Sequence, residues 1–170
     1  MKLCMIGTGY VGLVSGTCFA DIGNQVYCVD KDKNKINKLN SGIPTIYEPG
    51  LDELIKKNFD ARRLFFTTDI KKAINSSDLI FICVGTPTKK GSLKVDLSFV
   101  YKCVKEILKH TKKKKIIITK STVPVGTGAE IEKIIKKKKK LFSVISNPEF
   151  LREGEAIRDF RYPDRIVIGS

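Results

Sequence analysis

Three glycines near the start of the chain have the spacing of a phosphate-binding turn. Gly7, Gly9 and Gly12 form the pattern G-x-G-x-x-G directly after the apolar residues 3–6. The first glycine permits a tight turn, the second lets a pyrophosphate approach the backbone, and the third lets a helix pack closely on a strand. A helix that begins here points free N–H groups and the positive end of its dipole at the phosphates. The pattern predicts dinucleotide binding, and a purely structural glycine turn is the alternative.

An acidic residue follows at the distance that this chemistry requires. Asp30 ends the second apolar run, residues 26–29, about 20 residues beyond the glycines, where a carboxylate accepts hydrogen bonds from an adenosine ribose. Its charge would repel a 2′-phosphate, so the residue favours NAD, although the adjacent Lys31 weakens this preference slightly. Lys35 lies one helical turn further and can reach the adenosine side of the cofactor or remain a plain surface lysine.

Glu149 is the best candidate for acid–base catalysis. It follows Pro148 and lies between apolar residues at the end of a predicted strand, where a carboxylate can act as a general base. A helix N-cap or a salt bridge to Arg152 is the alternative. The Thr122 hydroxyl can donate to a cofactor or a water, or it can serve only a turn. Glu153 is expected to be a carboxylate at a helix start unless the cofactor reaches it.

Other side chains argue against metal, thiol or histidine chemistry. The chain has one histidine, His110, which lies at a predicted helix end beside lysines, so we expect a surface role. The five cysteines fall in apolar segments without a C-x-x-C pair and indicate buried thiols in a reducing compartment. No Asp, Glu, His or Cys cluster has the spacing of a metal site.

Apolar runs and helical patterns alternate along the whole chain and must position these residues. Their order predicts an α/β fold with an open, mostly parallel, doubly wound sheet, a single Rossmann-type domain. The 170 residues suffice for one domain with its own core. The expected strands are residues 3–6, 26–29, 64–67, 79–84, 116–118, 142–145 and 165–168, and the expected helices are residues 10–23, 31–40, 52–57, 69–74, 97–110, 127–138 and 154–160.

This architecture predicts where a ligand binds. In open parallel sheets, ligands lie outside the carboxyl ends of the strands. The glycine turn, Asp30, and the polar segments 85–88, 121–124 and 146–150 each follow a predicted strand. We therefore expect all of them at one edge of the sheet.

The charge of the chain does not by itself indicate a polyanionic partner. The net charge is +14 and the pI about 9.6, which suits nucleic acid, an acidic membrane or an anionic small molecule. Much of the excess lies in the lysine runs 112–115 and 136–140, which lack interleaved aromatics. We read them as a solvated face and predict no nucleic-acid and no membrane partner. Glycines interrupt the apolar N-terminus and Asp21 follows, so we expect a cytoplasmic protein without a targeting segment.

Six ordered motifs resemble the nucleotide-sugar 6-dehydrogenases of the UDP-glucose/GDP-mannose dehydrogenase family. They cover nearly the whole chain and comprise the glycine turn with Tyr10 and Val11, YEPGL at 47–51, GTPT at 85–88, KSTVP at 120–124, NPEFLREG at 147–154 and PDRIVIG at 163–169. The segments 151–154 and 163–165 favour UDP-glucose as the sugar nucleotide. GDP-mannose and UDP-N-acetylmannosamine are the alternatives within the family.

The resemblance implies a role for each matching residue. The residues that would bind NAD are Gly7, Gly9, Tyr10, Val11, Gly12, Asp30, Lys35, Thr86, Thr122 and Glu153. The catalytic residues would be Glu149, as acid–base group through a water, and Thr122, which assists it. The residues that would line the UDP-glucose are Glu149, Phe150, Leu151, Arg152 and Glu153.

The family oxidises a sugar C6 alcohol to a carboxylate in two hydride transfers, with two NAD and a cysteine thioester. The resemblance places the nucleophilic cysteine, a lysine and an aspartate in a central helix and a C-terminal UDP-sugar domain beyond Ser170. We therefore expect residues 1–170 to be the NAD-binding part, unable to complete the oxidation alone. The resemblance also implies that the full-length enzyme is a homodimer formed through the central helix. A stand-alone NAD-binding or regulatory module is the alternative from another functional class.

Overall fold

Six strands pair side by side into one sheet in the order β3-β2-β1-β4-β5-β6. The structure is a computed structural model that describes residues 1–89, 91–92 and 94–170. Every pairing between the named strands is parallel, which confirms the predicted doubly wound α/β fold. The strands are β1 (Lys2–Ile6), β2 (Gln25–Val29), β3 (Leu64–Thr67), β4 (Leu79–Ile82), β5 (Lys115–Thr119) and β6 (Phe142–Ser146).

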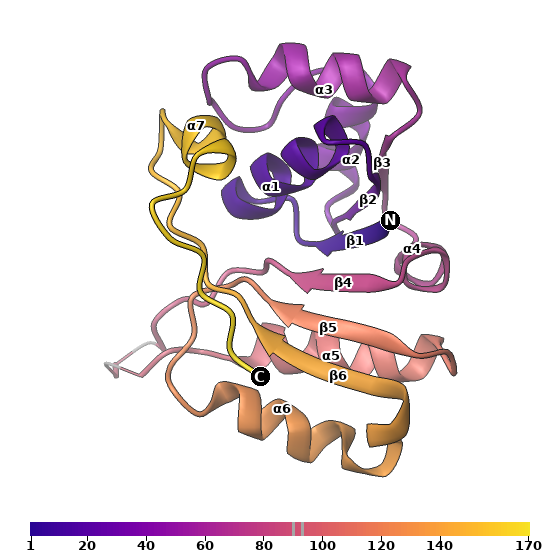
Figure 1. Ribbon diagram of the computed structural model, residues 1–170, viewed down its shortest axis with the longest axis vertical. Helices are drawn as coiled ribbons and strands as arrows, with labels where there is room; N and C mark the ends of the chain where they lie inside the picture. Colours follow the sequence, from indigo (N-terminus) through magenta and orange to yellow (C-terminus); the bar gives the residue numbers. More distant parts are fainter. Residues whose placement is uncertain (90, 93) are drawn as a thin grey trace.

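Helices cover both faces of the sheet (Figure 1). They are α1 (Tyr10–Asp21), α2 (Lys33–Asn40), α3 (Leu51–Asp60), α4 (Ile70–Ser76), α5 (Ser98–His110), α6 (Thr127–Ile135) and α7 (Ala156–Arg161). Helices α1, α2, α3 and α7 pack on one face, and α4, α5 and α6 pack on the other. The strand order reverses between β1 and β4, which is the point where an open sheet of this kind forms its binding crevice.

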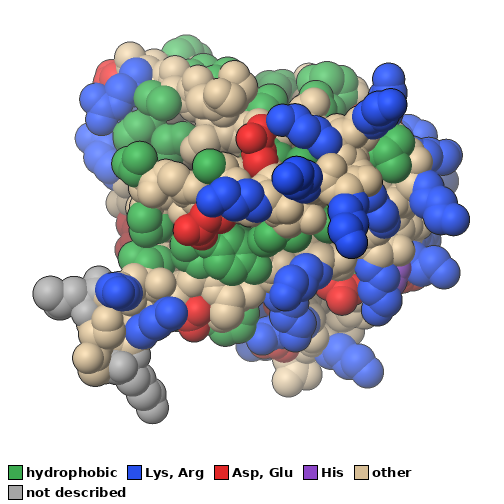
Figure 2. Space-filling model, turned by 90° about the horizontal axis from the view of Figure 1, so that it is seen from below, with side chains coloured by type: hydrophobic (Ala, Val, Ile, Leu, Met, Phe, Trp, Pro, Cys, Tyr) green, Lys and Arg blue, Asp and Glu red, His purple; other side chains and the backbone are tan. Residues whose placement is uncertain are grey.

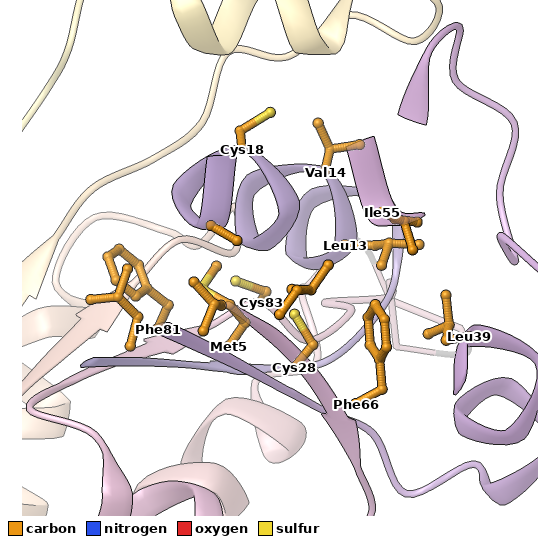
Figure 3. Packing of buried hydrophobic residues seen from close by; sticks show 14 of the residues in the cluster. Met5, Leu13, Val14, Cys18, Cys28, Leu39, Ile55, Phe66, Phe81 and Cys83 are labelled. Atoms are coloured by element: carbon orange, nitrogen blue, oxygen red, sulfur yellow. The ribbon is translucent and has the colours of Figure 1, made fainter. Parts of the chain in front are cut away.

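Two apolar layers hold these helices against the sheet. Figure 3 shows one of them, in which Leu13 of α1, Leu39 of α2 and Ile55 of α3 meet the buried side chains of the strands. The second layer lies on the other face and includes Ile80 and Ile117, both fully buried. Strands covered on both faces must be apolar along their whole length, and this explains the continuous apolar runs in the sequence.

Several element bounds differ from the prediction by two or three residues, and two of the differences have a clear physical reason. Residues 165–168 form no strand, because only Gly169 pairs, through one antiparallel bridge to Ser146, the last residue of β6. The apolar side chains of Ile166 and Ile168 are 68% and 69% exposed, so no layer of the core fixes this segment in a sheet. The sixth helix ends at Ile135 rather than at 138, because like-charged lysines at helical spacing repel one another and residues 136–141 form a 3-10 turn instead.

The lysine runs are mostly solvated, as predicted. Residues 112–114 and 136–140 are exposed. Figure 2 views the molecule from the side of α6 and shows Lys and Arg side chains spread over this surface. Lys115 is an exception, since it is buried and its ammonium donates to the Ser77 carbonyl. Within the described part of the chain, no helix is long and apolar enough to span a membrane.

The centre of the sheet should dominate the stability of the fold. Ile117 is fully buried in β5, so Ile117→Ala is expected to lower the free energy of unfolding by about 2–5 kcal/mol through lost transfer energy and a residual cavity. Ile43 is 55% exposed, and Ile43→Ala is the matched control, with an expected change within about 0.5 kcal/mol. Urea denaturation measures both. An equal loss in the two variants would contradict this account of the core.

Candidate functional site

The loops that follow β1, β2, β4, β5 and β6 lie at the same edge of the sheet, as the topology predicts. Backbone hydrogen bonds join neighbouring loops there: the Gly7 N–H donates to the Val29 carbonyl at 2.8 Å, and the Asn147 N–H donates to the Thr119 carbonyl at 2.9 Å. The Thr86 hydroxyl donates to the carbonyl of Thr122 at 2.9 Å. The structure therefore brings the predicted cofactor and catalytic segments together.

The glycine turn has the shape that a pyrophosphate needs. Gly7 has φ +103°, and a Cβ there would lie 2.7 Å from the Cys83 carbonyl oxygen. A Cβ on Gly12 would lie only 1.9 Å from the Gly7 carbonyl oxygen, so no side chain fits between the turn and α1. A Cβ on Gly9 would meet nothing within 4 Å. The turn is thus closely packed at Gly7 and Gly12 and open at Gly9, where the first N–H groups of α1 can face a phosphate.

Asp30 is fixed in place beside this turn. Its Oδ2 accepts hydrogen bonds from the Thr8 N–H at 3.0 Å and the Thr8 hydroxyl at 2.8 Å, and its Oδ1 accepts from the Asp32 N–H at 3.1 Å. Burial raises the pKa of the Asp30 carboxyl, but these hydrogen bonds and the charge of Lys35 outweigh it and hold that pKa below its ordinary value. The ionised carboxylate has about four acceptor positions, so one remains for a ribose hydroxyl.

Thr8 and Lys120 are site residues that the sequence reasoning missed. Thr8 is fully buried between two glycines, and its hydroxyl ties the turn to Asp30. Lys120 is only 7% exposed at the end of β5, and its ammonium donates to the Asn147 side-chain oxygen at 3.3 Å. Burial lowers the pKa of Lys120, and nearby Cys83 and Glu149 oppose that shift. A lysine directly after an apolar strand was the available signal for this buried cation.

Glu149 lies half-buried after β6, next to the buried Lys120. Its Oε2 accepts the Leu151 N–H at 2.6 Å, which shapes the turn that follows. The alternative salt bridge between Glu149 and Arg152 is wrong, because Arg152 instead donates to Asp159 at 2.7 Å through its terminal nitrogen and at 3.1 Å through Nε. Glu149 keeps a second carboxylate oxygen for a water or a substrate.

The remaining predicted residues lie around this centre. Phe150 is 45% exposed, with the Arg165 guanidinium 4.4 Å from its ring centroid. Glu153 is exposed, two residues before the N-cap position of α7. The Tyr10 hydroxyl donates to Glu48 and accepts from the Gly154 N–H at 3.2 Å. Tyr10 therefore directs its side chain at the 152–154 backbone, and its own N–H belongs to the open first turn of α1.

The cysteines are unsuited to nucleophilic chemistry. All five are free and buried. Burial raises the pKa of the Cys18 and Cys83 thiols to about 12 and that of Cys103 to about 11. It also raises the pKa values of Cys4 and Cys28. A reactive cysteine needs a lowered pKa, since the thiolate is the nucleophile.

Comparison with known proteins identifies the family to which this arrangement is related. The model of the UDP-glucose/GDP-mannose dehydrogenase family, NAD binding domain, matches residues 1–170. The UDP-glucose 6-dehydrogenase of Rhizobium meliloti (strain 1021) is 55% identical over 171 residues, which are 99% of this chain and 39% of that protein. The UDP-glucose 6-dehydrogenase TuaD of Bacillus subtilis (strain 168) is 54% identical over 172 residues, 99% of this chain and 37% of that protein.

Solved structures of nucleotide-sugar dehydrogenases have a fold closely similar to that of this chain. A ternary complex of GDP-mannose dehydrogenase from Pseudomonas aeruginosa has a TM-score of 0.91 at 39% identity, over 99% of this chain and 41% of that one. A UDP-glucose dehydrogenase from Pyrobaculum islandicum has a TM-score of 0.91 at 38% identity, over 98% of this chain and 40% of that one. The chain spans about two-fifths of the length of these relatives.

The Arg152–Asp159 pair should make stability depend on pH. Hydrogen bonds from Arg152 lower the pKa of the Asp159 carboxyl from 3.8 to about 2. A carboxyl whose pKa is lower in the folded chain stabilises the fold fully above its unfolded value, and this contribution is lost as the pH falls from about 4 to about 2. The difference in Tm between the wild-type chain and Asp159→Asn should therefore be largest above pH 4 and shrink towards pH 2. Asp60→Asn, which alters an exposed carboxylate of α3, is the control. A Tm difference that stays constant with pH would refute this role.

Proposed function

Because the chain belongs to the UDP-glucose/GDP-mannose dehydrogenase family and is its NAD-binding domain, we propose that it is the cofactor-binding part of a UDP-glucose 6-dehydrogenase. The observation that carries this proposal is the position of the glycine turn, Asp30 and Glu149 at one edge of the sheet. The two relatives at 54% and 55% identity, which are named UDP-glucose 6-dehydrogenases, support the choice of sugar nucleotide.

The glycine turn and the first turn of α1 would hold the pyrophosphate of NAD, and Asp30 would bind its adenosine ribose. Val11, Lys35, Thr86, Thr122 and Glu153 would complete the contacts. Bound NAD supplies the hydride acceptor for the oxidation of the sugar C6 carbon. The rest of the chemistry belongs to protein side chains and water.

Glu149 would move the protons of the reaction. Its carboxylate oxygen that does not bind the Leu151 N–H can hold a water and accept a proton from it, while the exposed Thr122 hydroxyl helps to orient that water. Lys120 is buried beside Glu149, and the two side chains would interact electrostatically. The segment from Glu149 to Glu153 would line the UDP-glucose.

Oxidation of an alcohol to a carboxylate removes four electrons and adds one oxygen atom from water, so the complete reaction would need two equivalents of the cofactor. We propose that a central helix and a C-terminal sugar-nucleotide domain supply the cysteine that carries the intermediate as a thioester. The burial of all five cysteines supports a nucleophile outside residues 1–170. The isolated chain is then inactive in turnover, and the full-length enzyme is a homodimer.

The free thiols also support a reducing, cytoplasmic location.

The alternative substrate is a different sugar nucleotide. The fold of the GDP-mannose dehydrogenase of Pseudomonas aeruginosa is as similar to this chain as that of the UDP-glucose dehydrogenase of Pyrobaculum islandicum. The lysine runs 112–115 and 136–140 lack interleaved aromatics, which supports the proposal of no nucleic-acid partner.

NAD binding to residues 1–170 is the direct test of the cofactor site. Calorimetric titration should show saturable binding to the wild-type chain, weakened by about tenfold or more in Asp30→Ala because hydrogen bonds to a charged group are lost. NADP should bind more weakly than NAD, since Asp30 repels a 2′-phosphate. Asp60→Ala, on the distant α3, should bind like the wild type. Equal affinities of Asp30→Ala and the wild-type chain would refute the assigned ribose site.

Turnover by the full-length enzyme tests Glu149 and the sugar together. We expect kcat with UDP-glucose and NAD to fall by about 100-fold to 10,000-fold in Glu149→Gln, because the amide cannot accept a proton. Glu132→Gln changes an exposed carboxylate of α6 and should leave kcat unaltered. A higher kcat/KM with GDP-mannose or UDP-N-acetylmannosamine than with UDP-glucose would replace the proposed substrate.

A further inference from the structure

Glu48 is a buried carboxylate that the proposed reaction does not use. It is 5% exposed and lies in the loop before α3. Its Oε2 accepts hydrogen bonds from the Tyr10 hydroxyl and, at 2.8 Å, from the Gly154 N–H. Its Oε1 accepts from the Ala156 N–H at 2.8 Å and the Ile157 N–H at 3.5 Å. Burying a carboxylate costs much free energy unless hydrogen-bond donors surround it. The four donors around Glu48 therefore hold its side chain in one position.

The donors come from the two functional segments of the site. Tyr10 is the first residue of α1 and directly follows Gly9 of the phosphate-binding turn. Gly154 directly follows the segment 149–153, which would contact the sugar nucleotide, and Ala156 lies two residues further along. The Tyr10 hydroxyl also lies 3.3 Å from the Arg152 carbonyl oxygen. Glu48 and Tyr10 therefore join the cofactor turn to the backbone of the substrate segment.

Helix α7, which follows this segment, also rests on α1. The Arg161 guanidinium donates to Asp21 at 2.8 Å, and the Phe160 ring packs edge-on against Phe19 with centroids 4.9 Å apart. Both partners belong to α1. Tyr10 and Asp21 are the two terminal residues of that helix, so a shift of its first turn would reach residues 152–157 directly.

We propose that Glu48 is a positioning residue that links occupancy of the phosphate-binding turn to the placement of residues 149–157. Phosphates bound at the first turn of α1 fix Tyr10, and Tyr10 with Glu48 fixes the backbone at Gly154 and Ala156. The cofactor thereby orders the segment that carries Glu149. This inference rests on the proposed function.

Backbone amide exchange, followed by NMR with and without saturating NAD, tests the link. In the wild-type chain, NAD should slow the exchange of the Gly154 and Ala156 amides. In Glu48→Gln, whose amide group retains a single acceptor oxygen, these amides should exchange about tenfold faster or more without NAD. Added NAD should still bind Glu48→Gln, as calorimetry would show, but should no longer slow these amides.

A second variant covers the case in which Glu48→Gln does not fold. Tyr10→Phe removes one hydroxyl and keeps the contacts of Glu48 with Gly154 and Ala156, so the Ala156 amide should stay protected while its response to NAD is lost. Tyr27→Phe in β2 and Glu53→Gln on the exposed face of α3 are the matched controls and should retain the NAD response.

The outcomes separate the two proposals. NAD binding without slower exchange at Gly154 and Ala156 in the wild-type chain, or a normal NAD response in Glu48→Gln or Tyr10→Phe, overturns the link and leaves the proposed function intact. Absence of NAD binding to the wild-type chain overturns the proposed function and the link with it.

Discussion

The close approach of two backbone segments at Gly7 and Gly12 is the constraint on which the site depends. Because a Cβ on Gly12 would lie 1.9 Å from the Gly7 carbonyl oxygen, only glycine lets α1 begin directly against the turn that leaves β1. That position of α1 points its first N–H groups at the edge of the sheet. It also determines where Tyr10, Phe19 and Asp21 lie, and these residues hold the C-terminal helix.

Buried and partly buried polar groups of the site are matched by hydrogen-bond partners. Asp30 accepts from Thr8 and Asp32, Glu48 accepts from four donors, and Lys120 donates to Asn147. Such groups would destabilise the fold if they stood alone, because burial disfavours the charged form. Their partners lie on different strands and loops, so the charges also fix the relative positions of those loops.

Local spacing was sufficient to predict most of the fold. Continuous apolar runs of neighbouring residues predict the strands β1, β4 and β5. The start of α4 is local in the same way, because the Asp69 side chain accepts the Lys72 N–H three residues further along at 2.9 Å. The carboxyl-edge rule then placed the glycine turn with Asp30 and the loops of Thr122 and Glu149, because parallel strands end on the same side. The segment 165–168 was predicted wrongly, since an apolar run makes a strand only where a partner edge continues.

The sequence by itself determined the fold class, the phosphate-binding turn and the candidate acids, because each depends on residue type and short-range spacing. Only the tertiary structure decided which side chains meet. The hydrogen bond between Glu48 and Gly154 spans 106 positions, and that between Thr8 and Asp30 spans 22. The sheet topology sets such pairings, and no local pattern in the chain encodes them. For the same reason, only the structure could show that Arg152 pairs with Asp159 rather than with Glu149.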